Sequence, residues 1–383
     1  MIDPDFWAGR RVLLTGHTGF KGAWLSLWLR SLGASLSGIA PGSPTEPSLY
    51  GLARTGSGMN EHRVDVRDSE GVWRVIDSER PEIVLHLAAQ PMVRRSLRDP
   101  RDTYEINVMG TVNVLEAVRT VGDVKAVVVI TSDKCYDNSG KVSRGRSFTE
   151  DDAMGGRDPY SSSKACAELV TQAYRSSYFS AGGTRLASAR AGNVIGGGDW
   201  GEDRLVADAV RAAAENHPVL VRNPDAVRPW QHVLNPLSGY LTLAQSLCAS
   251  SEFSGAWNFG PSETDARPVR FVLDELCARW PTPLSWRTDE RPNPPEAGFL
   301  MLDSGKARER LGWHPTWGLE KALSKIVQWH EQHRCGADMR DVSLAQIQEF
   351  MQHRLPYRSA GHPSPDPAAW VEPDDSEPED CLA

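Results

Sequence analysis

The sequence has few of the features that mark disulfide-rich, zinc-binding or membrane-spanning proteins. Its 383 residues include six cysteines, which form neither a CxxC pair nor a Cys/His group at zinc-site spacing. No apolar run approaches the roughly 18 residues of a membrane span, and the acidic start Met-Ile-Asp-Pro-Asp lacks an apolar signal core. We therefore expect a reduced, cytoplasmic protein without a bound metal and without a membrane partner.

Basic residues are also fewer than acidic ones. The chain has 42 Lys and Arg against 50 Asp and Glu, a net charge of −8. Most of the excess lies between Ser359 and Ala383, a stretch with seven acidic residues and no Lys or Arg. Because the remainder is nearly neutral, we expect no nucleic-acid partner. The Pro-rich acidic segment 357–383 has too few apolar residues to offset the entropy of ordering, and we expect it to be disordered.

The first half of the chain alternates short β-branched runs with longer helical patterns, which is typical of parallel strands joined by crossover helices. The expected strands are 11–15, 36–40, 63–66, 82–88, 125–132 and 185–191. The expected helices include 21–32, 205–215, 236–250, 319–334 and 342–354. The composition changes after Gly192, where we expect loops rich in Gly, Asp, Trp and Pro. We therefore expect an α/β sheet domain over 1–192, to which later segments can return, and a smaller lobe with terminal helices over 193–356.

A glycine-rich segment lies where the first expected strand meets the first expected helix. It reads Thr15-Gly16-His17-Thr18-Gly19-Phe20-Lys21-Gly22. The three glycines allow the tight turn, close backbone approach and close helix packing that a dinucleotide pyrophosphate needs at a helix N-terminus. With the alternating elements, this segment predicts a Rossmann-type, doubly wound parallel sheet that binds a dinucleotide through residues 16–22.

The acidic residue that commonly binds the adenosine ribose at the end of the second strand is absent. The sequence there is Gly38-Ile39-Ala40-Pro41-Gly42. The adenosine ribose must therefore be bound by other groups.

A second constellation is Tyr160-Ser161-Ser162-Ser163-Lys164, with Ser132 at the end of the longest apolar strand. Residues four apart share a helix face, so Lys164 can place its ammonium near the Tyr160 phenol and a cofactor ribose. A nearby cation lowers the pKa of tyrosine from its usual value near 10. Together these residues predict oxidation of an alcohol to a ketone by hydride transfer, with Tyr160 as base and Ser132 holding the oxygen.

The chain resembles the nucleotide-sugar 4,6-dehydratases of the extended short-chain dehydrogenase/reductase superfamily. The resemblance runs from about Arg10 to about Trp329. Its motifs are GHTGFKG (16–22), DVRD (65–68), HLAAQ (86–90), TSDKCYDN (131–138), YSSSK (160–164), RAGNVIGGGDW (190–200) and RPWQHVLNPLSGYL (228–241). It is most similar to the members that act on CDP-glucose.

The resemblance implies a three-step cycle on bound NAD. Tyr160 takes the 4-hydroxyl proton while the C4 hydride goes to the nicotinamide, water leaves across C5 and C6, and the hydride returns to C6. The product would be CDP-4-keto-6-deoxyglucose, with no net redox change. The intermediate ketone makes the C5 proton acidic, because its conjugate base is an enolate.

The resemblance also implies further binding residues. For the cofactor it implies Asp65 and Val66 at the adenine, and Leu87, Ala88 and Ala89 along the cleft. For the substrate it implies Asn193 and Arg204 at the nucleotide diphosphate and Arg228 as a pyrophosphate clamp, a task that suits guanidinium geometry.

Elimination needs an acid for the departing 6-hydroxyl and a base at C5. Related dTDP-glucose dehydratases use an Asp-Glu pair, where this chain has Asp133-Lys134. By position, Asp133 would be the acid and Lys134 the base, or Lys134 would instead order a water or stabilise the enolate. Adjacent strand residues point to opposite faces, so both side chains reach one substrate only if the strand ends near residue 133.

Three readings of the function remain open from the sequence. The first is the dehydratase described above. The second is an epimerase, or a dehydratase for another nucleotide sugar, and the third is a dinucleotide-sensing protein of the same fold that performs no chemistry. Similar enzymes are dimers through a four-helix interface, which here would involve 103–118 and 160–177, so the resemblance implies a homodimer or a dimer of dimers.

Overall fold

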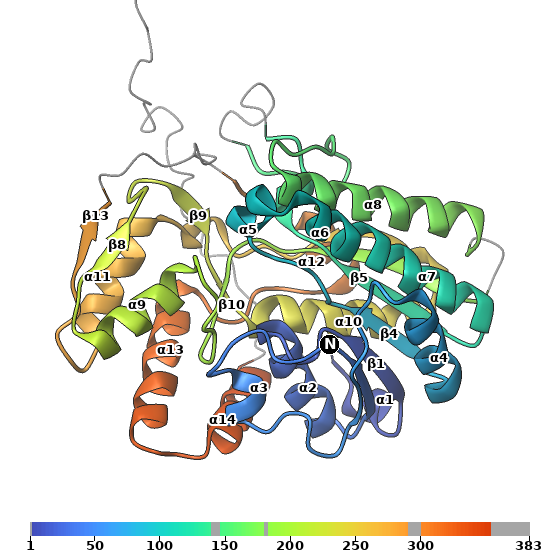
Figure 1. The fold of residues 1–383 in the computed structure, drawn as a ribbon, viewed down its shortest axis with the longest axis horizontal. Coiled ribbons are helices and arrows are strands. Elements are labelled where there is room, and N and C mark those ends of the chain that lie inside the picture. Colours follow the sequence, from blue (N-terminus) through green and yellow to red (C-terminus); the bar gives the residue numbers. More distant parts are fainter. Residues whose placement is uncertain (1, 139–145, 180–182, 290–299, 354–383) are drawn as a thin grey trace, which may run out of the picture.

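A seven-stranded parallel sheet forms the centre of the molecule (Figure 1). The computed structural model describes residues 2–138, 146–179, 183–289 and 300–353, so segment 357–383 lies outside the described residues. The strand order is β11-β6-β5-β4-β1-β2-β3. The strands are β1 (Arg11–Thr15), β2 (Ser35–Ile39), β3 (Asn60–His62), β4 (Ile83–His86), β5 (Ala126–Ile130), β6 (Arg185–Arg190) and β11 (Gly255–Asn258).

Helices cover both faces of this sheet, as the alternation of elements predicts. One face packs against α2 (Phe20–Ser31) and α10 (Leu234–Ala249), and α14 (Met339–Gln352) packs in turn against α2. The other packs against α4 (Ser69–Glu79), α7 (Gly110–Val121) and α8 (Pro159–Ser177). Strand β5 is buried at every position because both of its faces are covered. The doubly wound fold is therefore confirmed.

The predicted strands agree with the structure, with one exception. Residues 63–66 are not a strand, and β3 lies three residues earlier, at Asn60–His62. The chain turns at Asp65, whose carbonyl accepts a hydrogen bond from the Asp68 amide. Strand β11 was not predicted, and it returns the chain to the sheet beside β6 after residue 192.

A second group of elements has its own apolar core at one side of the sheet (Figure 1). Its helices are α9 (Leu205–Glu215), α11 (Val269–Arg279) and α13 (Leu319–Arg334). Its strands pair as β8 (Val219–Val221) with β13 (Trp286–Thr288), β9 (Val227–Pro229) with β12 (Ala266–Pro268), and β7 (Val194–Ile195) with β10 (Gln231–His232). These short strands carry the segments that the sequence assigned to the substrate.

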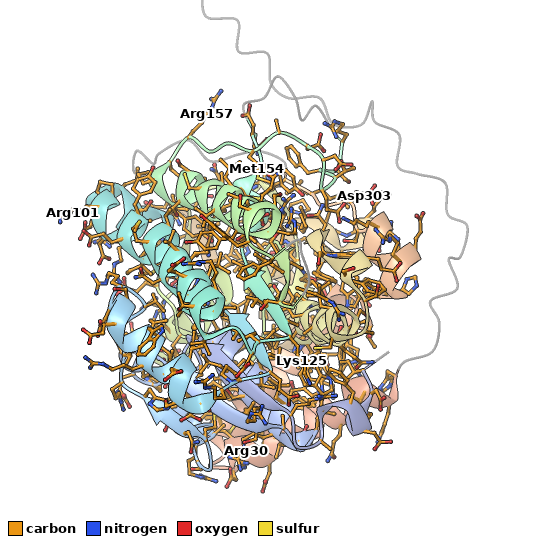
Figure 2. The ribbon with its side chains drawn as sticks, turned by 90° about the vertical axis from the view of Figure 1, so that its right-hand side faces the viewer. Arg30, Arg101, Lys125, Met154, Arg157 and Asp303 are labelled. Carbon is orange, nitrogen blue, oxygen red and sulfur yellow. The ribbon has the colours of Figure 1, made fainter. Side chains whose placement is uncertain are left out.

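The remaining elements are short. They are α1 (Pro4–Trp7), α3 (Leu49–Leu52), α5 (Val93–Arg98), α6 (Pro100–Tyr104), the π-helical turn η1 (Glu105–Met109), α12 (Gly305–Leu311) and the 3-10 turns η2 (Asp133–Cys135), η3 (Ser251–Phe253) and η4 (Glu263–Asp265). Charged side chains such as Arg101 and Arg157 lie at the periphery (Figure 2). Among the helices of the described residues, none has the length and apolar character needed to cross a bilayer.

Candidate active site

The glycine-rich segment connects β1 to α2 at the carboxyl edge of the sheet. Gly16 adopts a φ of +73°, and a Cβ there would lie 2.8 Å from the Ala88 amide nitrogen. A Cβ on Gly22 would lie 2.1 Å from the Gly16 carbonyl oxygen, so the turn and the helix pack directly backbone to backbone. The N-cap of α2 is Gly19, and no side chain among the described residues caps this end of the helix. Its amides therefore fit a pyrophosphate, as a dinucleotide site requires.

Two side chains of this segment turn toward β2 and β3. The His17 ring is buried, with Nε2 2.9 Å from Glu61 Oε1, and it covers Gly38, where a Cβ would lie 2.5 Å from His17 Nδ1. Thr18 Oγ1 donates to the Gly42 carbonyl at 2.6 Å. Both contacts join the phosphate turn to the end of β2, where the usual ribose-binding acid is absent.

The next two side chains turn toward the opposite side of the site. Lys21 Nζ lies 3.4 Å from the Tyr240 hydroxyl oxygen, and the Phe20 ring packs against Gly196. Burial lowers the pKa of Lys21 to about 8, with Arg204 adding to the effect. Lys21 thus brings a cation from the phosphate turn into the catalytic region.

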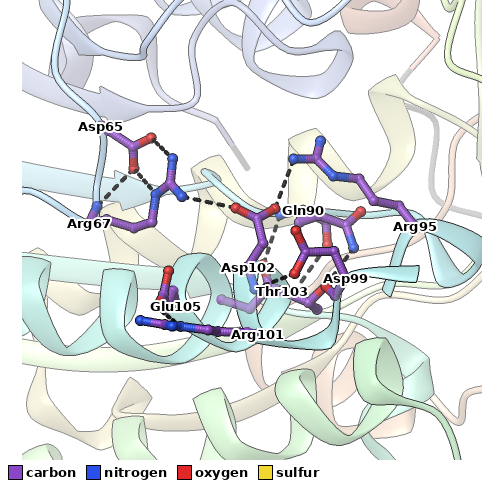
Figure 3. Close-up of polar contacts among 10 residues, drawn as sticks. Asp65, Arg67, Gln90, Arg95, Asp99, Arg101, Asp102, Thr103 and Glu105 are labelled. Atoms are coloured by element: carbon purple, nitrogen blue, oxygen red, sulfur yellow. Dashed lines mark hydrogen bonds and ion pairs between the residues drawn. The ribbon is translucent and has the colours of Figure 1, made fainter. Parts of the chain in front are cut away.

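The Asp65 carboxylate forms an ion pair with an arginine of the same chain. Arg67 Nη2 lies 2.7 Å from Asp65, and Arg67 Nη1 lies 2.9 Å from Asp102, which also accepts from Arg95 (Figure 3). The hydrogen bonds from Arg67 hold the pKa of Asp65 below its usual value. An adenine at this position would therefore meet a carboxylate fixed by Arg67.

The other predicted cofactor residues follow β3 and β4, at the carboxyl edge of the sheet. Val66 is buried against Gly110. Residues 87–89 follow β4, where the Leu87 amide donates to the Thr15 carbonyl at 3.2 Å and the Ala88 amide donates to Thr15 Oγ1 at 3.1 Å. These bonds place Leu87, Ala88 and Ala89 next to the glycine turn.

Tyr160 lies in the first turn of α8, which begins with Pro159 and is capped by the Asp158 carboxylate. Ser132, just beyond the end of β5, lies within hydrogen-bonding reach of the Tyr160 hydroxyl and acts to lower its pKa. Lys164 follows one turn later, nearly fully buried, with Nζ 3.5 Å from the Ile130 carbonyl oxygen. The structure therefore brings Ser132, Tyr160 and Lys164 together.

The pKa of Tyr160 differs from the prediction. Burial raises the pKa of Tyr160 to about 12, although the hydrogen bond to Ser132 and the charge of Arg204 act in the opposite direction. Burial also lowers the pKa of Lys164 to about 8. The expectation of an acidic tyrosine is wrong for this structure, because desolvation of the phenolate outweighs the neighbouring cations.

Strand β5 ends before the Asp133-Lys134 pair, as simultaneous access to one substrate requires. Residues 133–135 form a 3-10 turn in which the Ser132 hydroxyl accepts a hydrogen bond from the Lys134 amide. Asp133 is 1% exposed, and burial raises its pKa. Its Oδ1 accepts from Ser132, whereas Oδ2 is buried without a partner among the described residues. Lys134 Nζ lies 5.8 Å from the centre of the Tyr160 ring.

Two of the three predicted substrate residues face these groups. Arg204 lies before α9, with Nη1 2.7 Å from Asp199 Oδ2, and its charge acts on Tyr160. Arg228 lies in β9, and its charge acts on Asp133. Asn193 is half-buried and joins β10 through its carbonyl, which accepts from the Gln231 amide at 3.2 Å. The two arginines therefore act on Tyr160 and Asp133 from elements that begin after residue 192.

Sequence analysis missed two residues that support the site. Asn107 lies buried in the π-helical turn η1, donates to Ser163 Oγ at 2.8 Å and accepts from the Gln90 amide. It joins the loop after β4 to the helix that carries Tyr160. Asp199, which orients Arg204, stands within the quoted motif 190–200 but was not singled out. The sequence around Asn107 gives no signal that distinguishes it from the other polar residues of the same stretch, such as Glu105 and Asn113.

The fold and this site agree with the comparisons to known proteins. The model of the NAD dependent epimerase/dehydratase family matches residues 12–258, and the chain belongs to this family. NAD is therefore its cofactor, and the uncapped glycine turn fits it. The UDP-glucose 4-epimerase of Thermus thermophilus, solved with NAD, superposes with a TM-score of 0.71 at 27% identity, covering 83% of this chain and 98% of that chain.

Two dehydratases of the same bacterial strain are similar to this chain to different degrees. The CDP-glucose 4,6-dehydratase of Salmonella typhimurium (strain LT2) is 51% identical over 357 residues, which covers 92% of this chain and 99% of that protein. The dTDP-glucose 4,6-dehydratase of the same strain is 24% identical over 343 residues, covering 84% of this chain and 92% of that protein.

Proposed function

We propose that this protein converts CDP-glucose to CDP-4-keto-6-deoxyglucose and water. The observation that carries the proposal is the 51% identity to a CDP-glucose 4,6-dehydratase over nearly the whole of both chains. The clustering of Ser132, Asp133, Tyr160 and Lys164 at the carboxyl edge of the sheet supports the reaction type. NAD, when bound, supplies a hydride acceptor that returns the same hydride, so no external reductant is consumed.

In the oxidation step, Tyr160 removes the proton from the sugar 4-hydroxyl. The hydrogen bond to Ser132 and the charge of Arg204 favour the phenolate, against the effect of burial. Lys164, one turn later on α8, adds a cation on the same helix face. Ser132 holds the 4-oxygen as it becomes a carbonyl.

In the elimination step, Asp133 donates a proton to the departing 6-hydroxyl. Its burial supports this role, because a raised pKa keeps a carboxyl group protonated at higher pH. Lys134 lies on the same turn beside the Tyr160 ring and is our candidate for the group that acts at C5. The C4 ketone lowers the barrier by delocalising the charge that develops when the C5 proton leaves.

The lobe that begins at residue 193 is proposed to bind the nucleotide. Arg204 and Arg228 carry the positive charge that a diphosphate requires, and Asp199 fixes the position of Arg204. Asn193 lies between the catalytic strands and this lobe. The sheet domain, 1–192 with β11, would then bind NAD and perform the chemistry.

Product analysis in heavy water tests the proposed function. We expect purified protein to form a 4-keto-6-deoxy sugar from CDP-glucose, with solvent deuterium at C5 and the original C4 hydrogen at C6. Absence of this product would overturn the proposal. Turnover of dTDP-, UDP- or GDP-sugars instead would indicate another substrate, an inverted C4 centre would indicate an epimerase, and NAD binding without turnover would indicate a sensor.

We also propose a cytoplasmic homodimer. Tyr104, Met109 and Leu169 are large apolar side chains that are 36–54% exposed, and they lie on α6, η1 and α8, which pack together. Free cysteines such as Cys135 and Cys166 fit a reducing compartment. Light scattering should give twice the monomer mass, and M109E/L169E should give the monomer mass.

A further inference from the structure

A buried ion pair lies directly behind the catalytic residues. Glu168 and Arg190 have side chains that are each 3% exposed, with Oε2 2.8 Å from Nη2. Thr131 Oγ1 donates to Glu168 Oε1 at 2.5 Å, and Ser188 Oγ donates to Oε2 at 2.6 Å. The catalytic cycle proposed above assigns no role to these residues.

Glu168 lies one helical turn after Lys164 on the same face of α8. Lys164 is 5% exposed, and the hydrogen bond described for its ammonium is a long one to the Ile130 carbonyl. A buried ammonium with so little hydrogen bonding tends to lose its proton unless a negative charge lies nearby. The charge of Glu168 acts on Lys164 in this sense.

The surroundings of Glu168 fix both its charge and its position. Burial by itself would raise the pKa of Glu168, yet Arg190 and the two hydroxyl donors hold that pKa below its usual value. Thr131 directly precedes Ser132, and Ser188 and Arg190 belong to β6. The carboxylate therefore ties α8 to the strand ends that carry the catalytic serine.

We propose that Glu168 is a positioning residue that keeps Lys164 a cation beside Tyr160, with Arg190 as the counter-ion of Glu168. The proposal rests on the proposed function for its kinetic readout. The Glu168 carboxylate thus lies between two cations, the Lys164 ammonium and the Arg190 guanidinium. Glutamine at position 168 would keep the size of the side chain but remove the charge that Lys164 needs.

Several other titratable groups surround Lys164, and each must stay unchanged in the test. Around Lys164 and Tyr160 they are Lys21 from α2, His86 from β4, Asp133, Lys134 and Cys135 from η2, Asp158 before α8, Arg204 before α9, and Tyr240 from α10. His86 is buried and its pKa is lowered by burial and by Lys164, so it is neutral above the acid range. Glu168 is the carboxylate that shares the Lys164 face one turn away.

The test compares E168Q with E168D. Glutamine keeps the size and hydrogen-bonding capacity but not the charge, whereas aspartate keeps the charge on a shorter side chain. In E168Q, Lys164 should lose its proton at lower pH, so the alkaline limb of the kcat/KM profile should fall by about one pH unit or more. In E168D the alkaline limb should shift by less than half as much as in E168Q, whatever the change in kcat. Equal shifts, or no shift in E168Q, would overturn the proposal.

Two further variants guard against a folding defect. Removing one member of a buried ion pair is strongly destabilising, whereas replacing both is often tolerated. The double variant E168Q/R190Q should therefore fold and still show a lowered alkaline limb. S188A removes one of the two hydroxyl donors to the Glu168 carboxylate but leaves Arg190, which keeps that carboxylate charged, so the limb should stay unchanged. If the alkaline limb of the double variant lay at the same pH as in the wild type, the ion pair would have a structural role only.

A measurement without substrate separates this proposal from the proposed function. Lysine side-chain NMR, with the Lys164 signal assigned by its loss in Lys164→Arg, follows the titration of Lys164 directly in the NAD-bound protein. The Lys164 pKa should be lower in E168Q than in wild type. That result would support the role of Glu168 even if CDP-glucose were not the substrate, and an unchanged Lys164 pKa would refute it even if CDP-glucose were turned over.

Discussion

The side of the site that we propose for the cofactor and the side that we propose for the sugar are built from different kinds of structure. Tyr160 and Lys164 lie on α8, a helix of 19 residues, and the glycine turn leads into α2, a helix of 12 residues buried along most of its length. On the sugar side, Arg204 lies in a loop after Asp203, which adopts a φ of +56°, and Arg228 lies in a strand of three residues.

This difference assigns separate tasks to the two sides. Groups on long packed elements hold their geometry closely, as proton and hydride transfer require. Groups on loops and short strands can be varied without disturbing the sheet, as a change of nucleotide or sugar requires. We therefore expect changes on the cofactor side to alter kcat or NAD binding, and changes on the sugar side to alter mainly KM.

The largest effect should come from Tyr160→Phe. Removing the hydroxyl removes the base of the oxidation step, so kcat should fall by about 10²–10⁴-fold while CDP-glucose binding stays within a few-fold. Tyr178→Phe at the exposed end of the same helix is the matched control and should retain activity. Steady-state kinetics with calorimetry checks both parts, and wild-type turnover by Y160F would contradict the proposed role.

The second effect should come from Gly22→Ala. A Cβ at this position would meet the Gly16 carbonyl at 2.1 Å and the His17 Cα at 2.8 Å, so the phosphate turn must move. NAD affinity should fall by about 10–100-fold, because the amides of the turn lose their alignment with the pyrophosphate. Gly51→Ala is the control, since its Cβ would make an ordinary contact at 3.5 Å. Calorimetry with NAD should show the loss in G22A alone.

The third effect lies on the sugar side. Arg228→Ala should raise KM for CDP-glucose by about 10–100-fold, as expected for losing hydrogen bonds to a charged group, with a smaller change in kcat. Arg287→Ala, on an exposed position of β13, should leave both constants unchanged. A loss in kcat without a change in KM would mean that the two sides do not divide their tasks in this way.

The same division explains what could be predicted from the sequence. The glycine turn, the Tyr160 and Lys164 spacing and most strands are contiguous patterns, and local periodicity determines them. Strand β3 was misplaced by three residues because the turn at Asp65 depends on side-chain hydrogen bonds with Arg67 and on a partner strand. Strand β11 was missed because it is short and joins the sheet only through β6.

The chemical environment of the site was harder to predict than its members. The raised pKa of Tyr160 follows from burial, which is a property of the folded molecule and not of the YxxxK spacing. The Asp199–Arg204 and Glu168–Arg190 pairs join residues whose contact depends on the fold around them. Resemblance to a family named the residues, whereas their charge states required the structure.

The smallest predicted effect concerns the stability cost of Asp133. Its Oδ2 is buried without a partner among the described residues, and burial raises its pKa above 3.8, the ordinary value. Because the folded protein holds this proton more tightly than the unfolded chain, Asp133 destabilises the fold increasingly as pH rises above about 4. Asp133→Asn should therefore raise the free energy of unfolding by about 1 kcal/mol at pH 8, and by less at pH 4.

Urea unfolding at the two pH values measures this effect, and product analysis measures its functional counterpart. D133N should oxidise C4 of CDP-glucose but leave a 4-keto sugar that retains its 6-hydroxyl, because the acid for elimination is missing. Asp199→Asn is the matched control: its carboxylate is paired with Arg204, so its loss should destabilise the fold. If D133N were less stable than wild type at pH 8, the buried carboxylate would have an unrecognised stabilising partner, and its role as a protonated acid would lose its physical basis.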